Sequence, residues 1–414
     1  MTMMRKIPEL LAPAGGMTQL RAALRFGADA VYGGMKHYGL RAFAGNFDTA
    51  ELRQAVSLCH DAGKKFYVTM NIFPYDDQLP GFIQAAREAA RLGVDAAIVG
   101  DLGALCALRE QVPELELHVS TQASTVNAPA VRHYQALGCS RVILAREMSL
   151  ERIAALHQSV GETIELETFV HGASCVAWSG RCLLSAALTG RSGNQGACAQ
   201  PCRWDWSVVE RKRPDEALPV AEDRNGTYLF SAKDLNLMPL LPQLVQAGVS
   251  SLKIEGRMKT EYYVATVVGA YRRALDLLAQ GEDIFQQALP ALMEELACAS
   301  HRDSDTGFLL GTPRQPAGAE GFHQQGEYIA RVASVSDAEG KAIIELKNRF
   351  YTGDEWTVLT PDGPQRMTAP LLRRVDTQEQ LTTYGVAGTM LEAVFPFAVG
   401  PGDLIRGKTR NHRL

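Results

Sequence analysis

The sequence predicts an α/β protein, a (β/α)8 TIM-like barrel followed by a small all-β domain. Between residues 9 and 257, eight short apolar segments rich in β-branched residues recur, and most precede a segment with helical apolar spacing. Continuous apolar strands that alternate with helices are typical of a parallel sheet covered by helices. Eight such units within about 290 residues favour a closed barrel. A doubly wound open sheet is the alternative, but no G-x-G-x-x-G motif marks a dinucleotide site.

The eight predicted strands are short apolar runs, most of them ending beside Gly or a polar residue. They are 9–15, 28–34, 65–73, 95–101, 115–124, 141–147, 166–172 and 251–257. Helical segments such as 17–27 and 79–93 place apolar residues three and four positions apart and end in Gly, a helix C-cap signal. Asp48 and Glu51 have the spacing of a capping box, which predicts that a helix begins after Asp48.

Composition narrows the class of protein. An apolar fraction of 46% with 21% charged residues is typical of a globular chain, and no apolar run approaches the ~18 residues of a membrane helix. The N-terminal segment has no secretory pattern. We therefore expect a cytoplasmic protein without a membrane partner. A net charge of −4 gives no general attraction to nucleic acid, so any RNA contact needs a local basic patch.

Polar residues stand late in most predicted strands, where a barrel of this class builds its active site. They are Asn71, Asp101, Ser120, Gln122, Arg146, Glu147, His171, Lys253, Glu255 and Arg257. Each alone could be a satisfied structural group, whereas ten on one rim predict a site. Among them, His171, Glu255 and Arg257 are the candidates for chemistry.

Four of the eight cysteines lie within 28 positions, in the long connection 173–250 between the last two predicted strands. They are Cys175, Cys182, Cys198 and Cys202. In a reducing compartment, clustered thiols favour a metal or redox site over disulfides. The spacing fits an iron–sulfur cluster better than the paired ligands of structural zinc, but zinc, free redox thiols and a Cys175–His171 nucleophile pair remain open.

The pattern changes after the barrel segment, which we place at 1–300. Residues 301–326 form a polar linker, and 327–414 show short alternating strands separated by turn signals, which predict a small β-barrel. Ten or so basic residues in this domain, Arg406 among them, fit either a tRNA-gripping surface or an ordinary solvated one.

The stretch "ETFVHGASCVAWSGRCLLS" (167–185) resembles the signature of the collagenase-like peptidase family U thirty-two. The matching positions are Glu167, Phe169, Gly172, Ala173, Cys175, Gly180, Cys182, Leu184 and Ser185. Ser174 departs from the aliphatic residue usual there. Further resemblance extends over nearly the whole chain, including "PELLAPAG", "NQGACAQPCRW", "SLKIEGRMK" and "KNRFYTGDEW".

The family name implies proteolysis. Members with this cysteine set and a C-terminal β-domain, however, look most like the bacterial tRNA 5-hydroxyuridine biosynthesis proteins, which hydroxylate the wobble uridine at C5 and depend on prephenate. Related members hydroxylate a ribosomal RNA cytidine or ubiquinone precursors. The resemblance thus implies that the four clustered cysteines hold a [4Fe–4S] cluster and that tRNA and an electron-donor or family-member protein are partners.

Chemistry favours the hydroxylase over the peptidase, because oxygenating an sp² carbon needs an oxidant or electron relay that a cluster supplies. An RNA base would have to be extruded into the barrel mouth. Its expected substrate-binding residues are Tyr38, Arg41, Asn71, Gln122, Arg146, Glu147 and Lys253. Arg146 and Lys253 suit a carboxylate such as prephenate. Structural Lys253–Glu255 or Arg146–Glu147 pairs, a peptidase and a zinc-bearing scaffold are the alternatives.

Overall fold

A computed structural model describes residues 7–409 except 42–43, 176–178, 181, 205–208, 211–212, 218–220, 224–225, 229–232, 312–321 and 336–339. Within the described part, no helix is long and apolar enough to cross a membrane.

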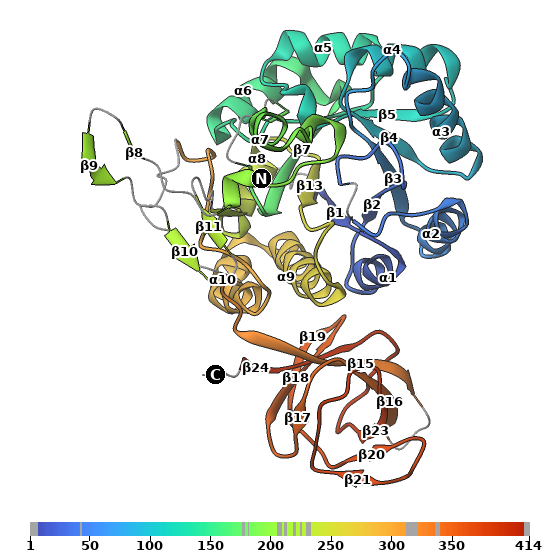
Figure 1. Cartoon of the computed structure of the whole chain (residues 1–414), viewed down its shortest axis with the longest axis vertical. Coiled ribbons are helices and arrows are strands. Elements are labelled where there is room, and N and C mark those ends of the chain that lie inside the picture. The colour runs from blue at the N-terminus through green and yellow to red at the C-terminus, as the bar shows by residue number, and fades with distance from the viewer. Residues whose placement is uncertain are drawn as a thin grey trace.

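Eight parallel strands close into a barrel, as predicted (Figure 1). They are β1 (Glu9–Pro13), β2 (Ala30–Gly34), β3 (Lys65–Met70), β4 (Ala96–Val99), β5 (Glu116–Val119), β6 (Arg141–Ile143), β7 (Glu165–Gly172) and β13 (Ser251–Ile254). Strand β13 pairs in parallel with both β7 and β1, so the sheet closes on itself. The doubly wound alternative is therefore wrong.

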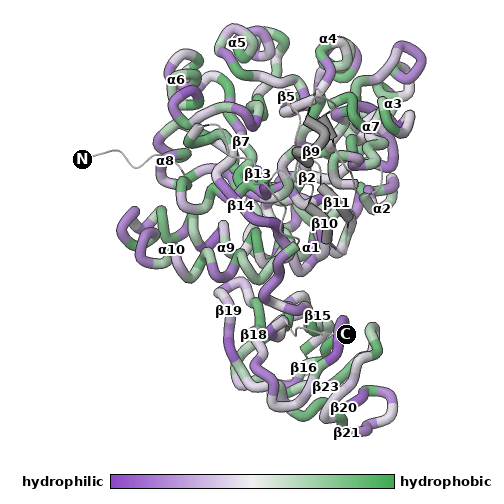
Figure 2. The backbone as a smooth tube through the Cα atoms, turned by 60° about the vertical axis from the view of Figure 1, so that its left-hand side comes forward, coloured by the Kyte–Doolittle hydropathy of each residue, from purple (hydrophilic) through white to green (hydrophobic). Residues whose placement is uncertain are grey.

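Helices cover the outside of the barrel. They are α1 (Met17–Arg25), α2 (Thr49–Asp61), α3 (Leu79–Arg91), α4 (Leu102–Gln111), α5 (Ala128–Ala136), α6 (Leu150–Val160), α8 (Leu241–Gln246) and α9 (Glu261–Gln280). Figure 2 shows polar and apolar stretches alternating along them, as expected of helices with one buried face. The predicted capping box is confirmed, since Asp48 accepts the Glu51 N–H at 2.9 Å and Glu51 accepts the Asp48 N–H at 3.1 Å.

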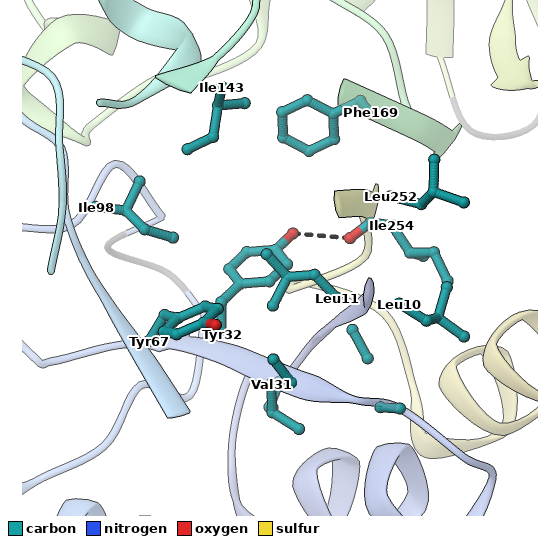
Figure 3. Packing of buried hydrophobic residues seen from close by; sticks show 14 of the residues in the cluster. Leu10, Leu11, Val31, Tyr32, Tyr67, Ile98, Ile143, Phe169, Leu252 and Ile254 are labelled. Carbon is teal, nitrogen blue, oxygen red and sulfur yellow. Dashed lines mark hydrogen bonds between the residues drawn. The ribbon is translucent and has the colours of Figure 1, made fainter. Parts of the chain in front are cut away.

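The barrel interior combines apolar side chains with a buried ionic layer. Leu11, Tyr32 and Phe169 are among the apolar and aromatic residues that fill it (Figure 3). Glu167 is fully buried and accepts from Lys253 Nζ at 2.8 Å and from an Arg141 guanidinium nitrogen at 3.1 Å. Burying these charges is tolerable only because each has a partner.

The cysteine-bearing connection between β7 and β13 has its own short elements. They are α7 (Leu184–Thr189), the 3-10 turns η3 (Gly193–Gln195) and η4 (Pro201–Arg203), the strands β8 (Val209–Glu210), β9 (Arg213–Ala217), β10 (Ala221–Asp223), β11 (Gly226–Tyr228) and β12 (Asp234–Asn236), and the turn η5 (Met238–Leu240). Strand β12 pairs antiparallel with β7 and so returns the chain to the barrel. The same sheet gains β14 (Ser304–Asp305), which follows helix α10 (Glu282–Ala297) in the segment predicted as linker.

The C-terminal part is an antiparallel all-β domain with a core of its own, around Trp356 and Phe350. Its main sheet follows the order β19-β18-β24-β15-β16-β23-β20-β21, and β17 and β22 pair separately. These strands are β15 (Gly326–Val335), β16 (Lys341–Leu346), β17 (Phe350–Tyr351), β18 (Glu355–Thr360), β19 (Gly363–Thr368), β20 (Leu372–Arg374), β21 (Gln380–Leu381), β22 (Thr383–Tyr384), β23 (Met390–Val394) and β24 (Leu404–Lys408).

This domain packs on helices α1, α9 and α10 (Figure 1). Among the described residues, three ion pairs cross the interface. Arg406 contacts both carboxylate oxygens of Glu295 at 2.7 and 2.8 Å, Arg25 contacts Asp403 at 2.6 Å, and Arg331 contacts Glu261 at 3.4 Å. Arg406 is 9% exposed, so it stabilises the interface and does not belong to a basic surface for tRNA.

Candidate active site at the barrel mouth

Glu255 lies at the centre of the mouth, directly after β13. The guanidinium of Arg41 is 3.5 Å from its Oε1, and the hydroxyl of Tyr32, which donates to the Ile254 carbonyl at 2.9 Å, is also 3.3 Å from its Oε2. Burial by itself would raise the pKa of this carboxyl, but the surrounding arginines outweigh that effect and hold its pKa below the ordinary value. Glu255 is therefore a fixed negative charge in the mouth.

Two further arginines face the same carboxylate without a direct acidic partner among the described residues. Arg146 donates to the carbonyl of Ala173 at 2.7 Å and lies 3.8 Å from the centre of the Phe169 ring. Arg257 is 3% exposed, and its two terminal nitrogens donate to Thr69, at 2.8 Å, and to Asn46. Its buried Nε has no partner in the described part of the chain. Three guanidinium groups around one carboxylate give the mouth an excess of positive charge.

Lys253 lies deeper than predicted. It is 3% exposed, its Nζ is 2.8 Å from Glu167, and it stands 4.3 Å above the ring of Tyr32. The alternative of a structural Lys253–Glu255 pair is wrong, because Glu167 is the acid within reach. The lysine belongs to the buried ionic layer, and a contact between it and a substrate stays a prediction.

Glu147 and Gln122 hold the cysteine-bearing connection against the rim. Glu147 accepts the backbone N–H of Ser179 at 2.9 Å and its hydroxyl at 3.1 Å, whereas Arg146 donates to Ala173, so the alternative Arg146–Glu147 pair does not form. The neighbouring Gly180 has a positive φ of 71°, and a side chain there would overlap the carbonyl oxygen of Gln122. Only glycine allows both the conformation and the close approach.

Asn71 and Tyr38 shape the loop that carries Arg41. The side-chain oxygen of Asn71 accepts the Leu40 N–H at 3.2 Å, and the ring of Tyr38 packs edge-on against Phe82 with 5.4 Å between centroids. Tyr38 thus turns toward α3. Gly196 of the cysteine-bearing connection contacts this loop, since a Cβ there would lie 2.6 Å from the carbonyl oxygen of Gly39.

The backbone carbonyl of His171 accepts the Glu255 N–H at 2.9 Å, but the His171 ring faces away from the other chemical candidates. Its ring packs against Tyr271 and Tyr263, both from α9, and the Tyr271 hydroxyl is 3.4 Å from Nδ1. Burial lowers its pKa to about 4, so the imidazole is neutral at physiological pH. Asp101 and Ser120, two other rim residues, cap α4 and the 3-10 turn η1 (Thr121–Ala123).

The four clustered cysteines lie in the cysteine-bearing connection and form no disulfide within the described part of the chain. Cys175 is exposed and the other three are half-buried. Their sulfurs are not assembled for coordination: in the described residues, no group of three or more His, Cys, Asp or Glu could hold a metal ion. The donor chemistry nevertheless fits a soft metal or cluster, and the backbone N–H of Gln200 points at Cys198 Sγ at 3.4 Å.

The thiols lie near the mouth. Glu255 is the main cause that raises the pKa of Arg41, and the thiols of Cys175 and Cys198 act on the same guanidinium in the same direction. A cluster on these cysteines would therefore stand within electrostatic reach of the Arg41–Glu255 pair.

Sequence reasoning missed two residues that organise the site, Tyr32 and Ser179, and it matched Ser185 to the family motif without giving it a role. Tyr32 is a polar-tipped aromatic in an otherwise apolar strand, a signal that could have been used. Ser179 and Ser185 act through contacts with residues far along the chain or across a turn, which no local pattern reveals.

Comparison with known proteins identifies the family. The model of Peptidase family U32 matches residues 15–318. The chain belongs to this family. This confirms the family expected from the 167–185 motif.

Several U32 relatives match most of the chain. It is 35% identical over 402 residues to tRNA hydroxylation protein P of Haemophilus influenzae, covering 86% of each chain. It is 36% identical over 404 residues to tRNA hydroxylation protein P of Escherichia coli, covering 86% of this chain and 87% of the other. A protein named collagenase from Porphyromonas gingivalis is 32% identical over 370 residues, covering 85% and 86%.

Proposed function

We propose that this protein is an iron–sulfur-dependent tRNA-modifying enzyme that hydroxylates the wobble uridine at C5 with prephenate as co-substrate. The observation that carries the proposal is the mouth itself, where Arg41, Arg146 and Arg257 surround Glu255 beneath the cysteine-bearing connection. The names of the relatives in Haemophilus influenzae and Escherichia coli support tRNA hydroxylation as the reaction.

The excess positive charge suits an anionic co-substrate. Prephenate carries two carboxylates, and arginine binds carboxylates with paired hydrogen bonds. Arg146 has a terminal nitrogen bonded only to a backbone carbonyl, and Arg41 keeps 44% of its side chain exposed, so both can turn to a ligand. Glu255 would hold the two guanidinium groups in place and orient the polar edge of an extruded base.

Cys175, Cys182, Cys198 and Cys202 would hold the [4Fe–4S] cluster. When bound, the cluster supplies the electron transfer that amino-acid side chains lack. The protein's contribution is to keep the thiols beside the mouth through the contacts of Ser179 and Gly180 with the rim. An electron-donor protein, or another member of the family, is the expected partner in a cytoplasmic setting.

Complementation tests the proposal. A host lacking its own homologue is given the intact chain, Cys175→Ala or Cys106→Ala, and its tRNA nucleosides are analysed by mass spectrometry. Cys106 is the matched control, an exposed cysteine on α4. Restoration of 5-hydroxyuridine derivatives by the intact chain and Cys106→Ala, but not by Cys175→Ala, supports the proposal. No restoration by well-expressed intact chain contradicts it.

A peptidase is the second candidate, favoured by the collagenase-named relative. Peptide hydrolysis by a cysteine needs a base within hydrogen-bond reach of the thiol. Among the described residues, His171 contacts Tyr271 rather than Cys175. Gelatin cleavage that disappears in Cys175→Ala would nevertheless favour the peptidase function. Hydroxylation of another RNA is tested by nucleoside analysis of ribosomal RNA from the same cells.

A further inference from the structure

One buried hydroxyl organises the segment between Cys182 and Cys202. Ser185, in the first turn of α7, is 2% exposed. Its Oγ donates to the carbonyl oxygen of Arg191 at 2.6 Å and accepts the backbone N–H of Ala199 at 2.9 Å. A hydroxyl offers one donor and two acceptor sites, so this single side chain joins α7, the turn after it and the residue that follows Cys198.

These hydrogen bonds connect the two ends of the cysteine-bearing segment. Cys182 lies two positions before α7 begins, and the turn η4, which contains Cys202, contacts the same helix. Next to Ala199, the N–H of Gln200 points at the sulfur of Cys198. The hydroxyl of Ser185 therefore ties the backbone next to Cys198 to the helix that follows Cys182.

We propose that Ser185 is a positioning residue that sets the spacing between Cys182 and the Cys198–Cys202 pair, so that the thiols can share one iron–sulfur cluster. This inference rests on the proposed function and adds a residue outside the set of sulfur ligands. Replacement by alanine leaves the N–H of Ala199 and the carbonyl of Arg191 without this partner and removes two partly buried hydrogen bonds. The backbone on either side of Cys198 is then free to move away from α7.

The test measures how firmly the cluster is held, independently of activity. The full chain and its variants are reconstituted with iron and sulfide without oxygen, then challenged with a chelator while remaining iron and acid-labile sulfide are measured. Ser185→Ala is expected to lose iron roughly 10-fold faster, the usual scale for residues that orient metal ligands. Ser185→Thr keeps the hydroxyl and is expected to restore retention. Ser192→Ala is the matched control, because the Ser192 hydroxyl has no hydrogen-bond partner among the described residues.

A second variant separates this effect from misfolding. Ala199→Pro removes the same hydrogen bond from the donor side, since proline has no N–H, and is expected to lose iron as fast as Ser185→Ala. Thermal unfolding of each cluster-free variant, followed by circular dichroism, shows that the barrel is intact. If folded Ser185→Ala keeps its iron as the intact chain does, the inference is overturned and the cluster proposal stands. If the intact chain takes up no iron and sulfide, both are overturned.

Discussion

The Arg41 guanidinium lies 3.5 Å from the carboxylate of Glu255, and in the part of the chain that is described this is the one ion pair made by the three mouth arginines. The pair joins a loop after β2 to the end of β13, and it stands between the barrel interior and the cysteine-bearing connection. Loss of this carboxylate would leave three neighbouring cations facing one another.

Glu255→Gln is expected to destabilise the protein by only about 1 kcal/mol, because Arg41 keeps 44% of its side chain exposed, and to abolish tRNA hydroxylation. Because the pKa of Glu255 is below its ordinary 4.5, the carboxylate stabilises the fold above that pH and the stabilisation is lost as pH falls through the lower folded value. Urea unfolding at pH 7 measures the difference. Glu110→Gln, on an exposed face of α4, is the control, and equal losses in the two variants would contradict this account.

Gly180→Ala is expected to weaken hydroxylation, because the new side chain must push the cysteine-bearing connection away from Gln122. Gly161→Ala is a matched control: its φ of 68° is also positive, but no atom stands within 4 Å of the added methyl group. Both variants bear the backbone strain of about 1 kcal/mol, seen in thermal unfolding. Only Gly180→Ala should lower the amount of hydroxylated nucleosides in tRNA. A similar decrease in Gly161→Ala would contradict the view that the close contact between Gly180 and Gln122 matters.

His171 should make stability depend on pH. Its folded pKa of about 4 lies below the ordinary 6.5, so the unfolded chain takes up the proton first, and the native state loses roughly 3 kcal/mol as pH falls from 6.5 to 4. Replacement by Gln should flatten this part of the stability curve, measured by urea unfolding from pH 4 to 7. His37→Gln, at an exposed position, should leave the curve unchanged. If the stability of His171→Gln still falls steeply as pH is lowered, the pH dependence belongs to other groups.

Arg406→Ala is expected to cost about 3 kcal/mol, since it leaves Glu295 buried without its partner. Arg374→Ala removes an exposed pair with Asp376 in the same domain and should change the free energy of unfolding far less than Arg406→Ala does. The free energy of unfolding in urea is measured for both variants and for Glu295→Ala. Similar costs for the two arginines would contradict the view that the domains are joined through Arg406.

The local sequence was sufficient for the elements and the family. Apolar runs of strand length, Gly at helix ends and the Asp48–Glu51 spacing predicted β1 to β7, β13 and the start of α2, because these features depend on residues a few positions apart. The 167–185 motif was enough to identify family U32.

Partners in space were decided only by the tertiary structure. Sequence placed Lys253 and Glu255 two positions apart, yet the strand directs Lys253 down to Glu167 and leaves Glu255 to Arg41 from a distant loop. His171 stands at a predicted strand end, but its ring faces α9. Closing a barrel joins strands that are far apart in sequence, and the direction of each side chain follows from that closure. Composition and spacing therefore determine which residues lie near the mouth. They do not determine which of those residues contact one another.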